Sequence, residues 1–234
     1  MHIIAHRGWS ECYPENTHAA FAAALTTGCH GIEFDVRLSA EGVVVVSHDA
    51  TLARFGGSSV PVSQLTVAGL RTSYPLPTLA EVLDRYRQVE LLIELKPHGG
   101  PAWTARLLAA ICRQIRQPAV RERVQLLCFN PGVLRAAHAA LPRLRLVRNC
   151  ITIPQASTAK SAAWMAVHAY CYALDPDFSA WTPALVAMAR KHGLRTSAYT
   201  INRLPELRRM AALGLDAVIT NRPLWARDWL HAHV

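Results

Sequence analysis

Short apolar runs alternate with amphipathic segments along nearly the whole chain, and this alternation constrains the fold more than any other feature. The runs have the length and composition of buried strands, and helix-forming segments separate most of them. We predict strands at 3–5, 31–36, 43–47, 91–96, 124–128, 145–149, 170–174, 196–200 and 217–220. The predicted helices cover 17–27, 63–71, 78–88, 101–117, 131–141, 182–192 and 204–213.

The number of these units indicates the architecture. Segment 43–47 follows a turn and is expected to fold back as a hairpin on 31–36, which leaves eight strands, each followed by a helix or loop. Eight βα units in 234 residues are typical of a (β/α)8 barrel. The alternative is a doubly wound open sheet, but no GxGxxG or Walker-type glycine loop follows any strand. We therefore predict α/β class, as a TIM barrel.

The chain is expected to form a single domain over 1–234. Residues 37–77 hold the hairpin and a loop-rich insertion after the second barrel strand, and 151–163 are expected to be a loop. The net charge of +9 favours anionic partners, but the arginines are spread along helices, so we predict no nucleic-acid binding.

The sequence also bears on compartment. The longest apolar run, 162–174, is too short to span a bilayer, and the first residues lack a signal-peptide pattern. Six scattered cysteines without a CxxC pair indicate reduced thiols. We expect a cytoplasmic protein without membrane insertion, either a monomer or a homodimer.

Three carboxylates are candidates for a metal site. Glu33 and Asp35 are two residues apart in one predicted strand, so they share a face, and Glu94 lies near the end of another. Burying such groups unpaired is costly, and a hard divalent cation would offset that cost. Because all the donors are oxygens, Mg²⁺ or Ca²⁺ is favoured over zinc. An outward strand face in water is the alternative for Glu33 and Asp35.

Four further charged or titratable residues also follow the carboxyl ends of predicted strands, where a barrel carries its active site. His6 and His48 could act as proton donor and acceptor beside the cation. Arg7 and Lys96 supply fixed positive charge suited to a phosphate. A structural histidine at a strand end and a simple Lys96–Glu94 ion pair are the alternatives for the individual residues.

Several short motifs resemble one family, the glycerophosphodiester phosphodiesterases, in order and spacing over essentially the whole chain. They are His6-Arg7-Gly8, Pro14-Glu15-Asn16-Thr17, Glu33-Phe34-Asp35-Val36, Glu41-Gly42 with Ser47-His48-Asp49, Ile93-Glu94-Leu95-Lys96, Thr200-Ile201-Asn202 and Ile219-Thr220-Asn221-Arg222-Pro223. The resemblance implies a TIM barrel that hydrolyses glycerophosphodiesters to glycerol 3-phosphate and an alcohol. One divalent cation, Mg²⁺, Ca²⁺ or Mn²⁺, is implied as cofactor, and a small glycerophosphodiester as partner.

The resemblance also implies roles for individual residues. Glu33, Asp35 and Glu94 match the metal ligands, His6 and His48 the acid/base pair, and Arg7 and Lys96 the phosphate-contacting positions. Glu15 matches a glutamate beside the site, and Asn16, or alternatively Thr17, is expected to cap the helix that follows. The chain departs from the usual family residues at Cys128-Phe129, Tyr199 and Asp175-Pro176-Asp177, and these positions are implied to line the alcohol or glycerol side of the pocket.

Two other functions remain open from the sequence. A related phospholipase D acting on lysophospholipids or sphingomyelin would share the histidines and carboxylates, but its secreted members should carry disulfides. A catalytically dead barrel that binds phosphorylated metabolites would have broken motifs, whereas the seven central positions are intact.

Overall fold

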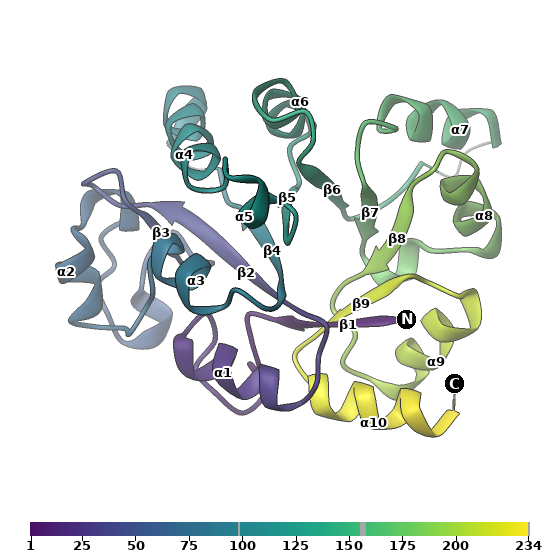
Figure 1. Ribbon diagram of the computed structural model, residues 1–234, viewed down its shortest axis with the longest axis horizontal. Helices are drawn as coiled ribbons and strands as arrows, with labels where there is room; N and C mark the ends of the chain where they lie inside the picture. Colours follow the sequence, from purple (N-terminus) through teal and green to yellow (C-terminus); the bar gives the residue numbers. More distant parts are fainter. Residues whose placement is uncertain (98, 155–157, 234) are drawn as a thin grey trace.

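The computed structural model is a closed barrel of parallel strands surrounded by helices (Figure 1). It describes residues 1–97, 99–154 and 158–233. In these ranges the barrel strands are β1 (His2–His6), β2 (Gly31–Leu38), β4 (Glu90–Leu95), β5 (Val124–Cys128), β6 (Arg145–Cys150), β7 (Ala173–Pro176), β8 (Arg195–Ala198) and β9 (Ala217–Thr220). Each pairs in parallel with its neighbours, and β1 pairs with both β2 and β9, which closes the barrel. The prediction of a TIM barrel is therefore confirmed.

Helices pack around the outside of the strands. They are α1 (His18–Thr26), α2 (Val67–Arg71), α3 (Leu79–Arg85), α4 (Gly100–Gln114), α5 (Pro118–Arg121), α6 (Pro131–Ala140), α7 (Thr158–Val167), α8 (Pro183–Lys191), α9 (Leu204–Leu213) and α10 (Pro223–His233). Side-chain oxygens start several of them by accepting backbone N–H groups: Thr78 forms a capping box with Glu81, and Thr182 accepts from Leu185.

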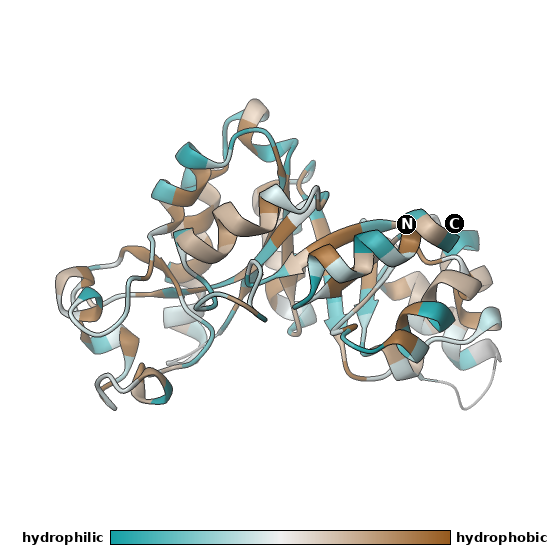
Figure 2. Cartoon of the chain, turned by 90° about the horizontal axis from the view of Figure 1, so that it is seen from below, coloured by the Kyte–Doolittle hydropathy of each residue, from teal (hydrophilic) through white to brown (hydrophobic). Residues whose placement is uncertain are grey.

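Two apolar layers hold the barrel together. The larger lies between strands and helices and includes Phe21, Phe34 and Trp181, all fully buried. The smaller fills the barrel interior with side chains from β1, β4, β5, β6, β7 and β9: Ile4, Leu92, Leu127, Val147, Ala173 and Ile219. This interior plug leaves space for polar groups only toward the ends of the strands. In Figure 2 the strands are mostly brown, whereas hydrophilic residues are frequent on the helices.

The insertion after β2 has a small core of its own. Strand β3 (Val44–Val46) pairs antiparallel with β2, so the predicted hairpin is confirmed. Beyond it lie two 3-10 turns, η1 (Ala53–Phe55) and η2 (Val62–Gln64), and then α2. Six buried residues pack together here: Val45, Leu52, Val62, Leu70, Tyr74 and Leu76. This satellite cluster supports the loops that approach the barrel mouth.

Several sequence-based boundaries were wrong. Strand β7 begins at Ala173 instead of residue 170, because the preceding residues form a turn. The expected loop at 151–163 instead contains the start of α7 at Thr158, while 155–157 lie outside the described residues. The helix predicted over 63–71 is divided into η2 and α2. Helices α5 and α10 were not predicted.

Two further features concern the state of the cysteines and the length of the helices. All six cysteines are free thiols, and Cys128, Cys150 and Cys171 are buried. No helix among the described residues is both long enough and apolar enough to cross a membrane.

Candidate active site

Three carboxylates meet at the carboxyl end of the barrel. Glu33 and Asp35 lie on β2, and the parallel register places Asp35 beside Glu94 of β4. One oxygen from each lies within 4.8 Å of the other two, and the residues are only 2%, 0% and 7% exposed. The alternative of an outward strand face in water is thus wrong for Glu33 and Asp35.

Burial and mutual repulsion disfavour the ionised forms of Glu33 and Glu94. Burial, together with Asp35 and Glu94, raises the pKa of Glu33 well above its usual value. Burial and the nearby Asp35 raise the pKa of Glu94 to about 7. A hard cation would stabilise the ionised forms, because three clustered carboxylate oxygens are the donor set that such ions prefer. The residues present therefore fit a divalent cation.

Two basic side chains contact Asp35, Arg7 from the end of β1 and Lys96 from the end of β4. Arg7 Nε lies 3.2 Å from one Asp35 oxygen, and Lys96 Nζ lies 3.1 Å from the other. Lys96 Nζ also lies 2.5 Å from Glu94 Oε1. Although burial alone would raise it, Lys96 and Arg7 lower the pKa of Asp35 to about 2. The basic groups thus keep Asp35 ionised and stand beside the carboxylates, where an anionic ligand would meet them.

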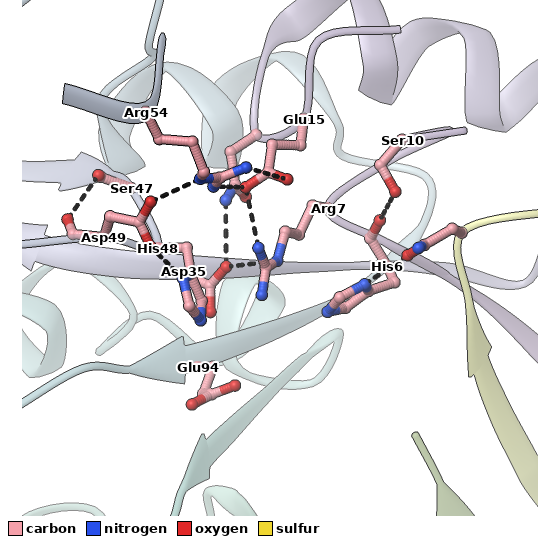
Figure 3. A network of polar contacts seen from close by, with 12 residues as sticks. His6, Arg7, Ser10, Glu15, Asp35, Ser47, His48, Asp49, Arg54 and Glu94 are labelled. Atoms are coloured by element: carbon pink, nitrogen blue, oxygen red, sulfur yellow. Dashed lines mark hydrogen bonds and ion pairs between the residues drawn. The ribbon is translucent and has the colours of Figure 1, made fainter. Parts of the chain in front are cut away.

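The two histidines lie on opposite sides of Arg7 (Figure 3). His6 ends β1, and its Nδ1 lies 2.6 Å from Asn221 Oδ1, while its Nε2 lies 3.9 Å from Glu33. Burial and the neighbouring Arg7 lower the pKa of His6 to about 4, so its imidazole is neutral near pH 7. Such an imidazole is available to accept a proton.

His48 follows β3 and is held by its neighbours. Its Nδ1 lies 2.7 Å from Asp49 Oδ1, and its backbone carbonyl accepts two hydrogen bonds from Arg37, at 2.9 and 2.6 Å. Burial lowers the pKa of His48, although Asp35 and Asp49 oppose that shift. The Asp49 contact involves Nδ1 and so orients the ring while leaving Nε2 outside this hydrogen bond. This arrangement is common for a histidine that transfers protons.

A residue that sequence analysis missed, Arg54 of η1, links the two sides of the site. Its guanidinium contacts Asp49 Oδ2 at 2.7 Å and Glu15 Oε1 at 2.6 Å. Glu15 in turn accepts a hydrogen bond from Arg7 at 2.9 Å. Arg54 also stacks over Phe55, 4.4 Å from the ring centroid. The insertion therefore braces both the His48 loop and the Arg7 loop (Figure 3).

The loop after β1 differs from expectation at Asn16. Thr17, not Asn16, caps α1 by accepting from Ala20. Asn16 has a φ of 57° and donates to Asp35 Oδ2 at 3.1 Å, from a position only 2% exposed. Its backbone N–H donates to the Arg7 carbonyl at 3.0 Å, which ties Asn16 to the turn that follows β1. The expected cap role was wrong because the left-handed backbone turns the amide inward.

Phe129, directly after β5, and Tyr199, directly after β8, border the site. Their rings meet edge-to-face with centroids 5.9 Å apart, and Lys96 Nζ lies 5.9 Å from the Phe129 centroid. Phe129 is 38% exposed, whereas the Tyr199 hydroxyl donates to the Cys150 carbonyl at 3.1 Å. The sequence analysis placed both residues at the substrate pocket, and both line the same hollow as His6, Glu33 and Glu94.

Comparison with known proteins decides the family. The profile of the glycerophosphoryl diester phosphodiesterase family matches residues 6–224. The chain belongs to this family. A glycerophosphodiester phosphodiesterase from Caldanaerobacter subterraneus subsp. tengcongensis is 30% identical over 94% of both chains. One from Bacillus subtilis is 28% identical, covering 94% of this chain and 83% of its own.

Solved structures agree with the family assignment. A putative glycerophosphoryl diester phosphodiesterase from Silicibacter pomeroyi has a TM-score of 0.85 and 26% identity, over 99% of this chain and 93% of its own. An Oleispira antarctica phosphodiesterase, solved in complex with the product sn-glycerol-3-phosphate, has a TM-score of 0.83 and 27% identity, over 99% and 97%.

The structure of this phosphodiesterase family member brings all the sequence-predicted site residues to one end of the barrel. The histidines, carboxylates and basic residues lie around Asp35, while Phe129 and Tyr199 lie beyond Glu94. Sequence reasoning missed Asn16 as an Asp35 partner, Arg54 as a brace and Asn221 as the His6 partner. Only Asn221 had a signal, its place directly after a predicted strand.

Proposed function

We propose that this chain is a divalent-cation-dependent glycerophosphodiester phosphodiesterase that releases glycerol 3-phosphate and an alcohol. Support comes chiefly from one observation: a buried carboxylate triad lies beside two histidines and two basic groups. The family match and the product in the Oleispira antarctica structure favour the same substrate class. The curated relatives give no support to the phospholipase D alternative.

Glu33, Asp35 and Glu94 would hold the cation, whose bound form would draw charge from the phosphate oxygens. Arg7 and Lys96 would bind the remaining phosphate oxygens, because guanidinium and ammonium groups pair well with that anion. Both groups already lie within 3.2 Å of Asp35. An anionic diester would therefore meet three positive centres: the cation, Arg7 and Lys96.

The histidines would transfer the protons. His6, neutral because of its lowered pKa, would remove a proton from the nucleophile, either water or the substrate's own 2-hydroxyl. His48 would protonate the leaving alkoxide, and Asp49 would stabilise its imidazolium form. Glu15 would hold Arg7 toward the phosphate.

The proposal is tested by release of sn-glycerol 3-phosphate from glycerophosphocholine in the presence of Mg²⁺, Ca²⁺ or Mn²⁺. We expect release that a chelator abolishes and added cation restores. A trapped cyclic 1,2-phosphate would identify the 2-hydroxyl as nucleophile. Product in which the phosphate remains on choline, or no product with any of the three cations, would contradict the proposed function.

A further inference from the structure

A small hollow adjoins His6 and two residues of the carboxylate triad, Glu33 and Glu94. Its volume is about 30 Å³, and its lining includes Asn149, Asp175 and Tyr199 together with His6, Glu33 and Glu94. The parallel register of β6 and β7 places Asn149 directly beside Asp175. Neither residue has a role in the proton-transfer scheme above.

Both residues are buried acceptors without partners. Asp175 is 0% and Asn149 3% exposed. Among the described residues, neither carboxylate oxygen of Asp175 accepts a hydrogen bond, and neither does Asn149 Oδ1. The Ser197 hydroxyl, on the adjacent strand, lies near enough to oppose the rise that burial causes in the pKa of Asp175, but it donates to the Leu174 carbonyl at 3.3 Å. Buried acceptors are nearly always paired in folded proteins, because an unpaired one forfeits its interaction with water.

The surroundings indicate what kind of group would pair with them. Tyr199 covers the hollow, but its hydroxyl is committed to the Cys150 carbonyl. The Arg148 guanidinium donates to the backbone carbonyls of Phe129 and Asn149, so it is directed to backbone groups and not to the Asn149 and Asp175 side-chain oxygens. Three oxygens therefore await donors, next to carboxylates that repel an anion. A hydroxyl or an ammonium group matches this set, whereas a phosphate does not.

We propose that Asp175 and Asn149 form a substrate subsite that accepts hydrogen bonds from a hydroxyl or primary ammonium group of the diester. The subsite makes Asp175 a specificity-determining residue and rests on the proposed phosphodiesterase function. The donor belongs either to the glycerol moiety, which every substrate carries, or to the alcohol esterified on the other side of the phosphate.

Three diesters separate these sources. Glycerophosphoethanolamine has donors on both alcohols, glycerophosphocholine only on glycerol, and bis(4-nitrophenyl) phosphate on neither. Asp175→Asn keeps the shape but replaces one carboxyl oxygen by an amide NH2, and Asn149→Leu removes the second acceptor at similar volume. Asp177→Asn is the matched control, because it makes the same change two residues along, where the carboxylate accepts hydrogen bonds from Ser179.

We expect Asp175→Asn to lower kcat/KM about 10- to 100-fold on a donor-bearing diester, mainly through KM, because the substrate donor would lose a buried acceptor. Hydrolysis of bis(4-nitrophenyl) phosphate should change less than about 2-fold. Equal losses on both glycerol diesters would assign the donor to glycerol, and a larger loss on glycerophosphoethanolamine would assign it to the ammonium. Equal changes on all three diesters, or the same pattern in Asp177→Asn, would overturn the subsite.

Binding separates the subsite from the proposed function. With Mg²⁺ present, calorimetry should show tighter binding of glycerol 3-phosphate or phosphoethanolamine than of inorganic phosphate, and Asp175→Asn or Asn149→Leu should narrow that difference. A wild-type chain without diesterase activity would contradict the proposed function alone. Equal affinity of the wild-type chain for all three phosphates would contradict the subsite even if diesters are hydrolysed.

Discussion

Nδ1 of His48 lies 2.7 Å from Oδ1 of Asp49, and the second Asp49 oxygen accepts from Arg54. The imidazole is thus one end of a chain of charged groups that runs from the barrel mouth into the insertion. Such a chain orients the ring without occupying Nε2, which leaves that atom for the substrate.

Removing the His48 side chain should lower kcat about 10²- to 10⁴-fold, because a positioned acid or base typically contributes that much. Asp49→Asn should give a smaller loss, since the ring remains but its charged partner is gone. Steady-state rates on glycerophosphocholine measure both effects. His233→Ala on α10 is the control, as this histidine is exposed and its hydrogen bond and ring stacking are both with Trp229 of the same helix. Near-normal turnover of His48→Ala would reject the acid role.

Arg54 should act as a positioning residue. Arg54→Lys keeps the charge but loses the planar fork that contacts Asp49 and Glu15 together. We expect kcat to fall about 10- to 100-fold through small displacements of His48 and Arg7. Arg71→Lys is the control, because Arg71 also lies in the insertion but pairs with Glu81. The activity of Arg54→Lys should fall while its melting temperature stays near that of Arg71→Lys. Equal activity of the two variants would contradict the positioning role of Arg54.

Gly8 is required by both its backbone angle and its neighbours. Its φ is 83°, and an added Cβ would lie 2.6 Å from the Ala20 backbone carbon. Gly8→Ala should therefore lower the free energy of unfolding by more than the roughly 1–2 kcal/mol that a left-handed alanine costs. Gly56→Ala is the matched control, because its φ is 75° with open space around it. Urea unfolding of the two variants measures the difference, and equal losses would contradict the packing argument.

The buried Asp175 should make stability depend on pH. Burial raises the pKa of Asp175 from 3.8 to about 7, so the folded chain binds a proton that the unfolded chain releases. This contribution is fully present below about pH 4 and is lost as pH rises through about 7. Relative to Asp175→Asn, wild-type unfolding free energy should thus fall over that interval, by on the order of 2–4 kcal/mol. Parallel urea titrations of both chains test this, and a constant difference would contradict it.

The sequence predicted those parts of the site that depend on local periodicity. Glu33 and Asp35 share a face because strand side chains alternate, and Glu94 joins them because parallel strands end at one mouth. The same rule brought in His6, Lys96 and Phe129. Eight βα units were countable because their apolar runs are short and well separated.

The remaining features depend on geometry that the sequence does not show. Asn16 points at Asp35 only because its backbone is left-handed. Arg54 reaches Glu15 across 39 positions of the chain, through a loop whose path depends on a satellite core. The pairing of Asn149 with Asp175 depends on the register between β6 and β7. Strand β7 begins only at Ala173, because the apolar residues before it form a turn.

Cation binding and turnover measured together test the central claim most directly. We predict that the chelator-treated chain binds one divalent cation per molecule and that release of sn-glycerol 3-phosphate rises in proportion to occupancy. Glu33→Gln and Glu94→Gln should weaken binding and turnover together. Full activity of the cation-free chain, or unchanged cation affinity in both carboxamide variants, would contradict the account.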